Sequence, residues 1–161
     1  MFNAGRWFAL AAGIVLLDQA TKMLVLGAFA PGERMSVTSF LNLVLVFNKG
    51  AAFSFLADAA GWQTWFFAGF AIVAAAIVSY LIVKDPTKTL FCTGLTLILG
   101  GAVGNLIDRL RLGHVVDFLD FHAAGWHWPA FNVADSGITV GALLLILESF
   151  VHDEKRARAS S

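Results

Sequence analysis

The sequence predicts an α-helical integral membrane protein with four transmembrane helices. Of its 161 residues, 58% are hydrophobic and only 14% are charged. A soluble protein of this size exposes a large share of its surface to water, so it has no room to hide that much apolar area. Four apolar runs are also long enough to cross a bilayer, which takes about 20 residues in a helix. Composition and run length together favour a multi-span membrane protein over a soluble helical bundle.

The first span is expected at residues 7–29. Asp18 and Lys22 interrupt this apolar run, and Pro31-Gly32 ends the helix. A cleaved signal peptide is the alternative, since Ala28-Phe29-Ala30 has the small-residue pattern of a cleavage site. The length of the run favours a retained helix.

A strand region is expected at residues 36–55, outside the hydrocarbon core. Residues 36–47 are rich in β-branched and aromatic types, and this run is too short to cross a membrane as a helix. Asn48-Lys49-Gly50 is a turn-prone stop, and Ala51 to Phe55 is predicted as a returning strand.

The other three spans are expected at residues 64–83, 90–110 and 134–151. Trp62 and Trp65 are typical of a membrane interface, where an amphipathic ring contacts both lipid and water. Glycines in the third span allow close helix packing or leave room for a substrate chain. A loop at 111–132 and a polar tail at 152–161 complete a single membrane domain over residues 1–161.

An even number of spans places both chain ends on one side of the membrane. Six basic residues fall on that side: Arg6, Lys84, Lys88, Lys155, Arg156 and Arg158. Four fall on the other side: Arg34, Lys49, Arg109 and Arg111. Because cytoplasmic loops carry the excess of Lys and Arg, this bias predicts cytoplasmic termini and places the strand region outside.

Ionisable residues inside apolar spans are costly and usually paired. Asp18 and Lys22 are four residues apart, so they meet on one helical face and neutralise one another. Asn105 and Arg109 also share a face, where they either hold a substrate backbone or lipid head group or belong to an internal polar network.

Asp117 and Asp135 lie near the outer ends of neighbouring spans, where antiparallel helices bring their side chains close. From the pattern alone they form a catalytic carboxylate pair, a cation-binding pair, or two unrelated loop acids. Asp120 competes with Asp117 for the same role, because it follows by only three residues.

Other chemistries are disfavoured. The net charge of zero argues against nucleic acid as a partner. His114, His122 and His127 lack compact zinc spacing, and Cys92, the single cysteine, sits in an apolar run as a packing residue. There is no phosphate-binding glycine loop and no convincing serine triad, which disfavours a nucleotide-binding protein and a serine enzyme.

Five motifs follow one another along nearly the whole chain: Asp18-Gln-Ala-Thr-Lys22, Asn48-Lys-Gly-Ala-Ala-Phe-Ser54, Gly100-Gly-Ala-Val-Gly-Asn-Leu-Ile-Asp-Arg109, Gly113-His-Val-Val-Asp-Phe118 and Phe131-Asn-Val-Ala-Asp-Ser136. In this order they resemble the motifs of the lipoprotein signal peptidases, the bacterial signal peptidase II family. Each is weak alone, and five in sequence with four spans are highly specific.

The resemblance implies an intramembrane-type aspartic endopeptidase of the bacterial cytoplasmic (inner) membrane. Such an enzyme removes the signal peptide of a diacylglyceryl-modified prolipoprotein, cutting just before the lipidated cysteine. By residue match, Asp117 and Asp135 are its catalytic pair. The substrate-binding and supporting residues implied are Asp18, Lys22, Asn48, Gly50, Asn105, Arg109 and Asn132.

The resemblance also implies a fold of four transmembrane helices with a small extracytoplasmic β-sheet, often called a β-cradle, and a short interfacial helix. It implies no metal or organic cofactor. The expected partners are the diacylated prolipoprotein substrate and membrane lipid, with no nucleic acid, and the enzyme is expected to work as a monomer.

As a mechanism we expect one aspartate to be ionised and the other protonated, because like charges in contact oppose double ionisation. The resting charge is assigned to Asp135, which sits at a helix N-terminus where the macrodipole favours an anion. The rival classes are a small transporter that uses the buried acids as a relay, and a structural subunit that tolerates loss of both aspartates.

Overall fold

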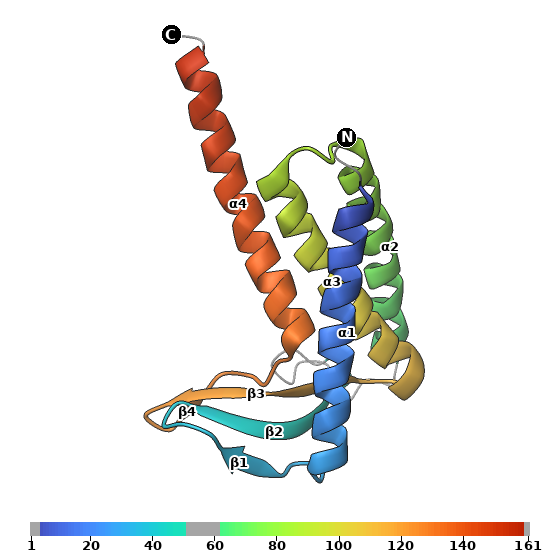
Figure 1. Cartoon of the computed structure of the whole chain (residues 1–161). Coiled ribbons are helices and arrows are strands. Elements are labelled where there is room, and N and C mark those ends of the chain that lie inside the picture. The colour runs from blue at the N-terminus through green and yellow to red at the C-terminus, as the bar shows by residue number, and fades with distance from the viewer. Residues whose placement is uncertain (1–3, 51–61, 160–161) are drawn as a thin grey trace.

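The computed structural model describes residues 4–50 and 62–159, with side chains described as far as Val151. Within these ranges the elements are α1 (Gly5–Ala28), β1 (Arg34–Ser36), β2 (Leu41–Asn48), α2 (Trp62–Lys84), α3 (Thr89–Leu112), β3 (Val115–Ala123), β4 (Trp126–His127) and α4 (Val133–Ala159). Figure 1 shows the helices as one bundle, with the strands lying across the end where α1 finishes and α4 starts.

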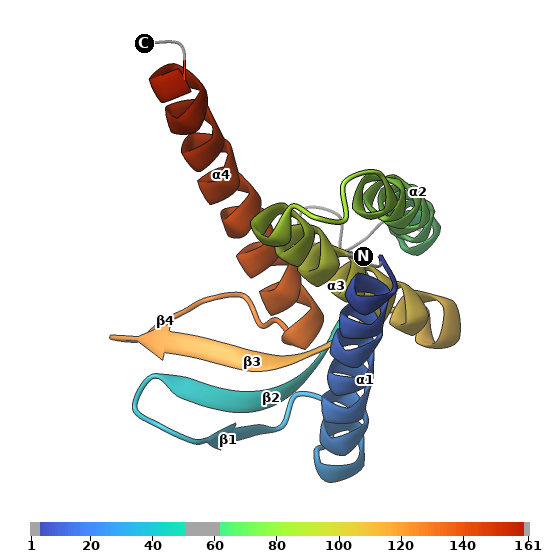
Figure 2. The ribbon, with the colours of Figure 1, turned by 45° about the horizontal axis from the view of Figure 1, so that its top comes forward.

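α3 is the central helix of the bundle. α1, α2 and α4 all pack against it, as the tilted view in Figure 2 shows, whereas α1 makes fewer contacts with α4. Buried apolar side chains fill the space between α1, α2 and α3, namely Trp7, Ala11, Val78, Ile82, Cys92, Leu95 and Leu99. The polar residues of the candidate site lie elsewhere, where α3 meets the ends of α1 and α4.

The sheet is antiparallel, with the strand order β1-β2-β3-β4. β2 and β3 pair from Leu41 opposite Phe121 to Asn48 opposite Val115, with an irregularity between Leu43 and Val46. A second apolar cluster fastens this sheet to the end of α1, and its buried members are Val25, Leu45, Val116 and Phe118. The sheet is thus a fixed platform beside the helix ends.

The predicted fold class is confirmed. Four helices are long and apolar enough to cross a membrane: Gly5–Ala28, Trp62–Lys84, Thr89–Leu112 and Val133–Val151. A small antiparallel sheet joins them, as expected for the strand region. Two parts of the expectation lie outside the described residues, namely the returning strand at 51–55 and any interfacial helix just before Trp62.

The expected loop at 111–132 is wrong, because β3 and β4 occupy half of it. β3 is buried along its first half on both of its faces, so its side chains do not alternate between apolar and polar. Its segment Val-Val-Asp-Phe-Leu-Asp therefore lacks the pattern by which a half-exposed strand is predicted. A consequence is that Asp117 lies on a strand, and not at the end of a helix.

Glycines on α3 let the neighbouring helices approach its backbone. A Cβ at Gly94 would lie 2.9 Å from the carbonyl oxygen of Gly141, and one at Gly101 would collide with the carbonyl oxygen of Ala134. Small residues at such contacts are how membrane helices pack closely. The glycines of α3 therefore position α4 and the acid near its start.

We predict that Gly101→Ala lowers the free energy of unfolding by about 1–3 kcal/mol, because the added methyl group forces α3 and α4 apart. Gly13→Ala is the matched control, since a Cβ at Gly13 meets nothing within 4 Å. The control should be neutral or slightly stabilising, as alanine favours a helix over glycine. Unfolding in detergent micelles, followed by tryptophan fluorescence, compares the two. Equal stabilities would contradict this account of the α3–α4 contact.

Candidate active site

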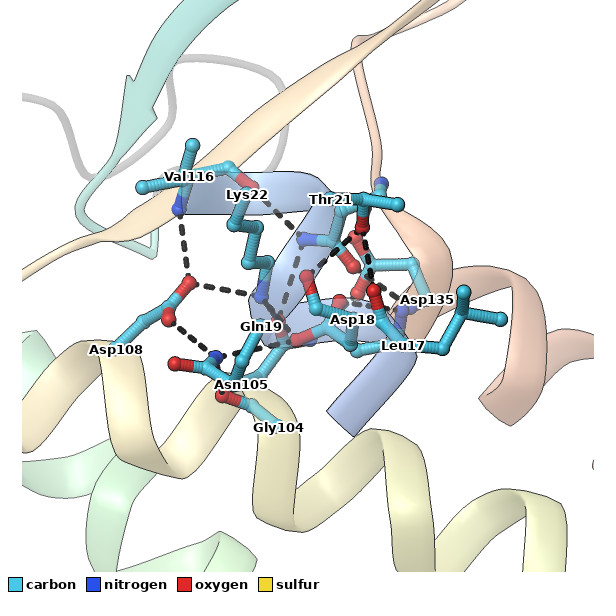
Figure 3. Close-up of polar contacts among 12 residues, drawn as sticks. Leu17, Asp18, Gln19, Thr21, Lys22, Gly104, Asn105, Asp108, Val116 and Asp135 are labelled. Carbon is cyan, nitrogen blue, oxygen red and sulfur yellow. Dashed lines mark hydrogen bonds and ion pairs between the residues drawn. The ribbon is translucent and has the colours of Figure 1, made fainter. Parts of the chain in front are cut away.

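The site is built around the buried ammonium group of Lys22, on α1. Its Nζ lies 2.9 Å from Asp18 Oδ2 and 2.8 Å from Asp108 Oδ2, and donates to Asn105 Oδ1 at 3.0 Å. Figure 3 shows these partners converging on Lys22 from α1 and α3. The predicted Asp18–Lys22 pair is present, and the second carboxylate, Asp108, adds a partner from another helix.

Both carboxylates of this group also bind backbone amides of other elements. Asp18 Oδ1 accepts from the amide of Ala134 in the first turn of α4, at 2.9 Å. Asp108 Oδ2 accepts from the amide of Val116 at the start of β3, at 3.1 Å. A carboxylate at a helix N-terminus satisfies a free amide and complements the helix dipole. Lys22, Asp18 and Asp108, which we call the charge group, therefore fix where α4 and β3 begin.

Asn132 and Asp135 form a capping box at the start of α4. The amide of Asp135 donates to Asn132 Oδ1 at 2.9 Å, and the amide of Asn132 donates back to Asp135 Oδ2 at 3.3 Å. Because Asp135 is held by both its backbone and its side chain, its carboxylate has a defined direction. Its Oδ1 accepts a further hydrogen bond from Asn105 Nδ2 at 2.7 Å.

Asp117 lies on the other side of Asn132. Asn132 Nδ2 donates to Asp117 Oδ1 at 2.7 Å and to Asn105 Oδ1 at 3.2 Å, so one amide group joins the surroundings of both acids. Asn48, at the end of β2, donates to Asp117 Oδ2 at 3.0 Å. Asp117 is 1% exposed and Asn132 fully buried, and this burial makes the geometry rigid.

Burial, together with the negative charge of Asp135, raises the pKa of Asp117 to about 7. The hydrogen bonds from Asn48 and Asn132 act in the opposite direction, because they favour the ionised form. Asp117 therefore holds a proton for much of the time at neutral pH, which a carboxyl group in water does not.

Gly50 and Arg109 support the site from its edge. The amide of Gly50 donates to Asn48 Oδ1 at 2.8 Å, and its φ of +100° is a conformation that suits glycine. Arg109 donates to the backbone oxygen of Asn105, at 3.2 Å, and its guanidinium lies 5.5 Å from the centroid of the Phe67 ring. Gly50 therefore binds Asn48, the neighbour of Asp117, and Arg109 binds Asn105, the neighbour of Asp135.

Asp120 is held apart from this arrangement. It accepts from Asn42 Nδ2 at 2.9 Å, and its carboxylate lies 2.8 Å from His127 Nδ1. Three residues along a strand reverse the direction of a side chain, so Asp117 and Asp120 point to opposite faces of β3. Of the two competing acids, only Asp117 shares a hydrogen-bonding partner with Asp135.

Two residues of the site were not expected as supporting residues. Asp108 completes the coordination of Lys22, and Gln19 Nε2 donates to Asp108 Oδ1 at 2.8 Å and to the carbonyl of Gly104 at 3.2 Å. Asp108 lies three residues after Asn105, on the same face of α3. This spacing is the sequence signal that places Asp108 on the polar face of α3.

Comparison with known proteins decides the family. The model of the family described as "Signal peptidase (SPase) II" matches residues 10–151. The chain belongs to the signal peptidase II family.

Close relatives and a solved structure agree with this assignment. The lipoprotein signal peptidase of Paraburkholderia phytofirmans is 55% identical over 154 residues, which cover 96% of this chain and 87% of the relative. That of Ralstonia nicotianae is 58% identical over 146 residues, covering 91% and 84% respectively. A bacterial membrane enzyme solved by the in meso method at 2.3 Å has a TM-score of 0.81 at 32% identity, covering 94% of this chain and 91% of its own.

In this signal peptidase II we predict that Lys22→Met destabilises the fold by about 3–5 kcal/mol, because Asp18 and Asp108 are left buried without a cation. The matched control is Lys88→Met. Lys88 pairs with Asp85 at 3.1 Å, but both side chains are at least 40% exposed, so its loss should cost less than about 1 kcal/mol. Unfolding in micelles measures both variants. A similar loss in both would refute the central role of Lys22.

Proposed function

We propose that this signal peptidase II is an aspartic endopeptidase in which Asp117 and Asp135 activate a water molecule. The observation that carries the proposal is the pair of acids held on either side of Asn132, one on β3 and one in the first turn of α4. The substrate proposed is a diacylglyceryl-modified prolipoprotein. Cleavage falls just before the lipidated cysteine and releases the signal peptide.

The two acids divide the roles of base and acid. Asp135 is the ionised member, because the N-terminus of α4 and the amides of Asn105 and Asn132 favour its negative charge. It takes a proton from the water that attacks the scissile carbonyl carbon. Asp117, protonated near neutral pH, donates its proton to the carbonyl oxygen and takes a proton back from the tetrahedral intermediate when that intermediate collapses. The proton taken by Asp135 then passes to the leaving amine as the C–N bond breaks.

The placement of the acids suits a lipidated substrate. Asp135 lines an open, mostly apolar groove of about 650 Å³ that also has Trp126, Phe131 and Val140 in its walls. This groove runs from the sheet onto the N-terminal part of the α4 span. The acyl chains therefore stay in lipid while the scissile bond lies near water. The proposed setting is the bacterial inner membrane, with cytoplasmic termini and the site near the outer face.

The proposed scheme needs no cofactor. The water, the two carboxyl groups and the amides around them account for each proton that moves. The partners proposed are the prolipoprotein and the surrounding lipid, with the monomer as the working unit.

We predict that Asp117→Asn and Asp135→Asn each lower the turnover of a diacylated prolipoprotein by about 10³-fold or more, since each removes a group that transfers a proton. Asp120→Asn is the control: it changes a carboxyl on the same strand that bonds to Asn42 and His127 instead. The control should keep its turnover within an order of magnitude. The assay uses purified full-length protein in micelles and follows release of the signal peptide. Normal cleavage by either of the first two variants removes that residue from the mechanism.

A second prediction concerns pH. Because Asp117 acts in its protonated form, kcat/KM should fall as the pH rises through about 7. Asn48→Ala removes a hydrogen bond that lowers the pKa of Asp117, so this fall should move to higher pH, by up to about one unit.

Asn42→Ala is the control for the pH measurement. Asn42 also lies on β2 but donates to Asp120, so the fall should stay where it is in the wild type. A fall that moves to lower pH in Asn48→Ala, or that moves equally in both variants, speaks against Asp117 as the acid.

A further inference from the structure

A second groove reaches the other member of the acid pair. It has a volume of about 280 Å³, and Asp117 lines it together with Asn48 and Lys49 at the end of β2 and with Pro129 and Ala130. We call it the polar groove, and we call the groove at Asp135 the apolar groove. The segment before α4 takes part in both, since Pro129 and Ala130 line the first and Phe131 lines the second.

The surroundings of the two grooves differ in a way that orients the substrate. The apolar groove includes Thr139 and Val140, which belong to the membrane span of α4. The described residues that line the polar groove belong to β2, to Lys49 just after it, to β3 and to the segment before α4, all outside the four spans. A signal peptide and acyl chains remain in the membrane, whereas the mature part of a lipoprotein lies in water. The mature chain therefore leaves through the polar groove.

Lys49 gives this groove a positive charge at its outer edge. It is exposed, and it directly follows Asn48, whose amide donates to Asp117 Oδ2 at 3.0 Å. The imidazole of His114 packs on Phe47 of the same groove, with ring centroids 4.3 Å apart. Burial lowers the pKa of His114, and the charge of Lys49 lowers it further, so His114 is neutral at pH 7 while Lys49 carries the charge.

Resting on the proposed function, we propose that Lys49 is a specificity-determining residue. It favours substrates that carry an acidic side chain in the first two positions after the lipidated cysteine, and it disfavours basic ones. Asp117 lines the same groove and would repel an acidic substrate if it were ionised. In the proposed reaction it is protonated, so it does not repel an acidic side chain. Because Lys49 is exposed, its attraction is modest and sensitive to salt.

The test compares two diacylated prolipoproteins that differ only in these two positions, with aspartate in one and lysine in the other. Purified full-length enzyme in low-salt micelles should cleave the aspartate substrate with a kcat/KM about two- to fivefold higher. Lys49→Arg should keep this ratio, Lys49→Gln should bring it to about one, and Lys49→Glu should invert it. Raising the salt to about 0.5 M should shrink the wild-type ratio, because the Debye length then falls well below 10 Å.

Arg111→Gln is the matched control. Arg111 is an exposed cation at the same end of the bundle that does not line the polar groove, so its removal should leave the ratio unchanged. A wild-type ratio of one, or a ratio that survives Lys49→Gln, overturns the proposal for Lys49 while the proposed function stands. Failure of the wild type to cleave either substrate overturns the proposed function and the inference with it.

Discussion

The structure depends on one buried cation. The ammonium of Lys22 is out of water, which is costly unless its donors are fully used, and its partners Asp18 and Asp108 come from two different helices. The charges are therefore satisfied only when α1 and α3 are packed together. Each carboxylate then binds a backbone amide of a third element, Ala134 on α4 or Val116 on β3. A single charge group thereby sets the position of the two elements that carry Asp117 and Asp135.

Amide side chains carry this order from the charge group to the acids. Asn105 accepts from Lys22 and donates to Asp135, while Asn132 donates to Asp117 and caps the helix that begins beside it. An amide has both donors and acceptors, so it joins two carboxylates without neutralising either, which a lysine or arginine in the same place would do. Among the described residues, neither acid is therefore paired directly with a cation, although Asp117 is almost fully enclosed and Asp135 is half-buried.

Much of this was predictable from the sequence, and the exceptions have physical causes. Run length and hydropathy were enough to predict four helices. A helix that crosses a membrane satisfies its backbone hydrogen bonds internally and presents a long run of apolar side chains to the lipid. The spacing of Asp18 and Lys22 predicted their contact, since both lie on one helix. The spacing of Asp108 from Asn105 placed both on one face of α3, but the contact of Asp108 with Lys22 depends on how α1 and α3 pack, which that spacing does not encode. β3 was missed because burial on both faces removes the alternation of apolar and polar residues. Without a predicted strand, the residue pattern alone did not distinguish Asp117 from Asp120.

The different elements that carry the acids explain why two identical carboxyl groups differ in chemistry. Asp135 is in the first turn of a helix, where the amides of Asn105 and Asn132 and the helix dipole favour an anion. Asp117 is on a strand, which has almost no dipole, and it is buried beside an existing negative charge, so it retains its proton. A pair of acids on two helix ends would share the same electrostatic environment. In the proposed mechanism, placing one on the sheet makes the acid and the base distinct before the substrate binds.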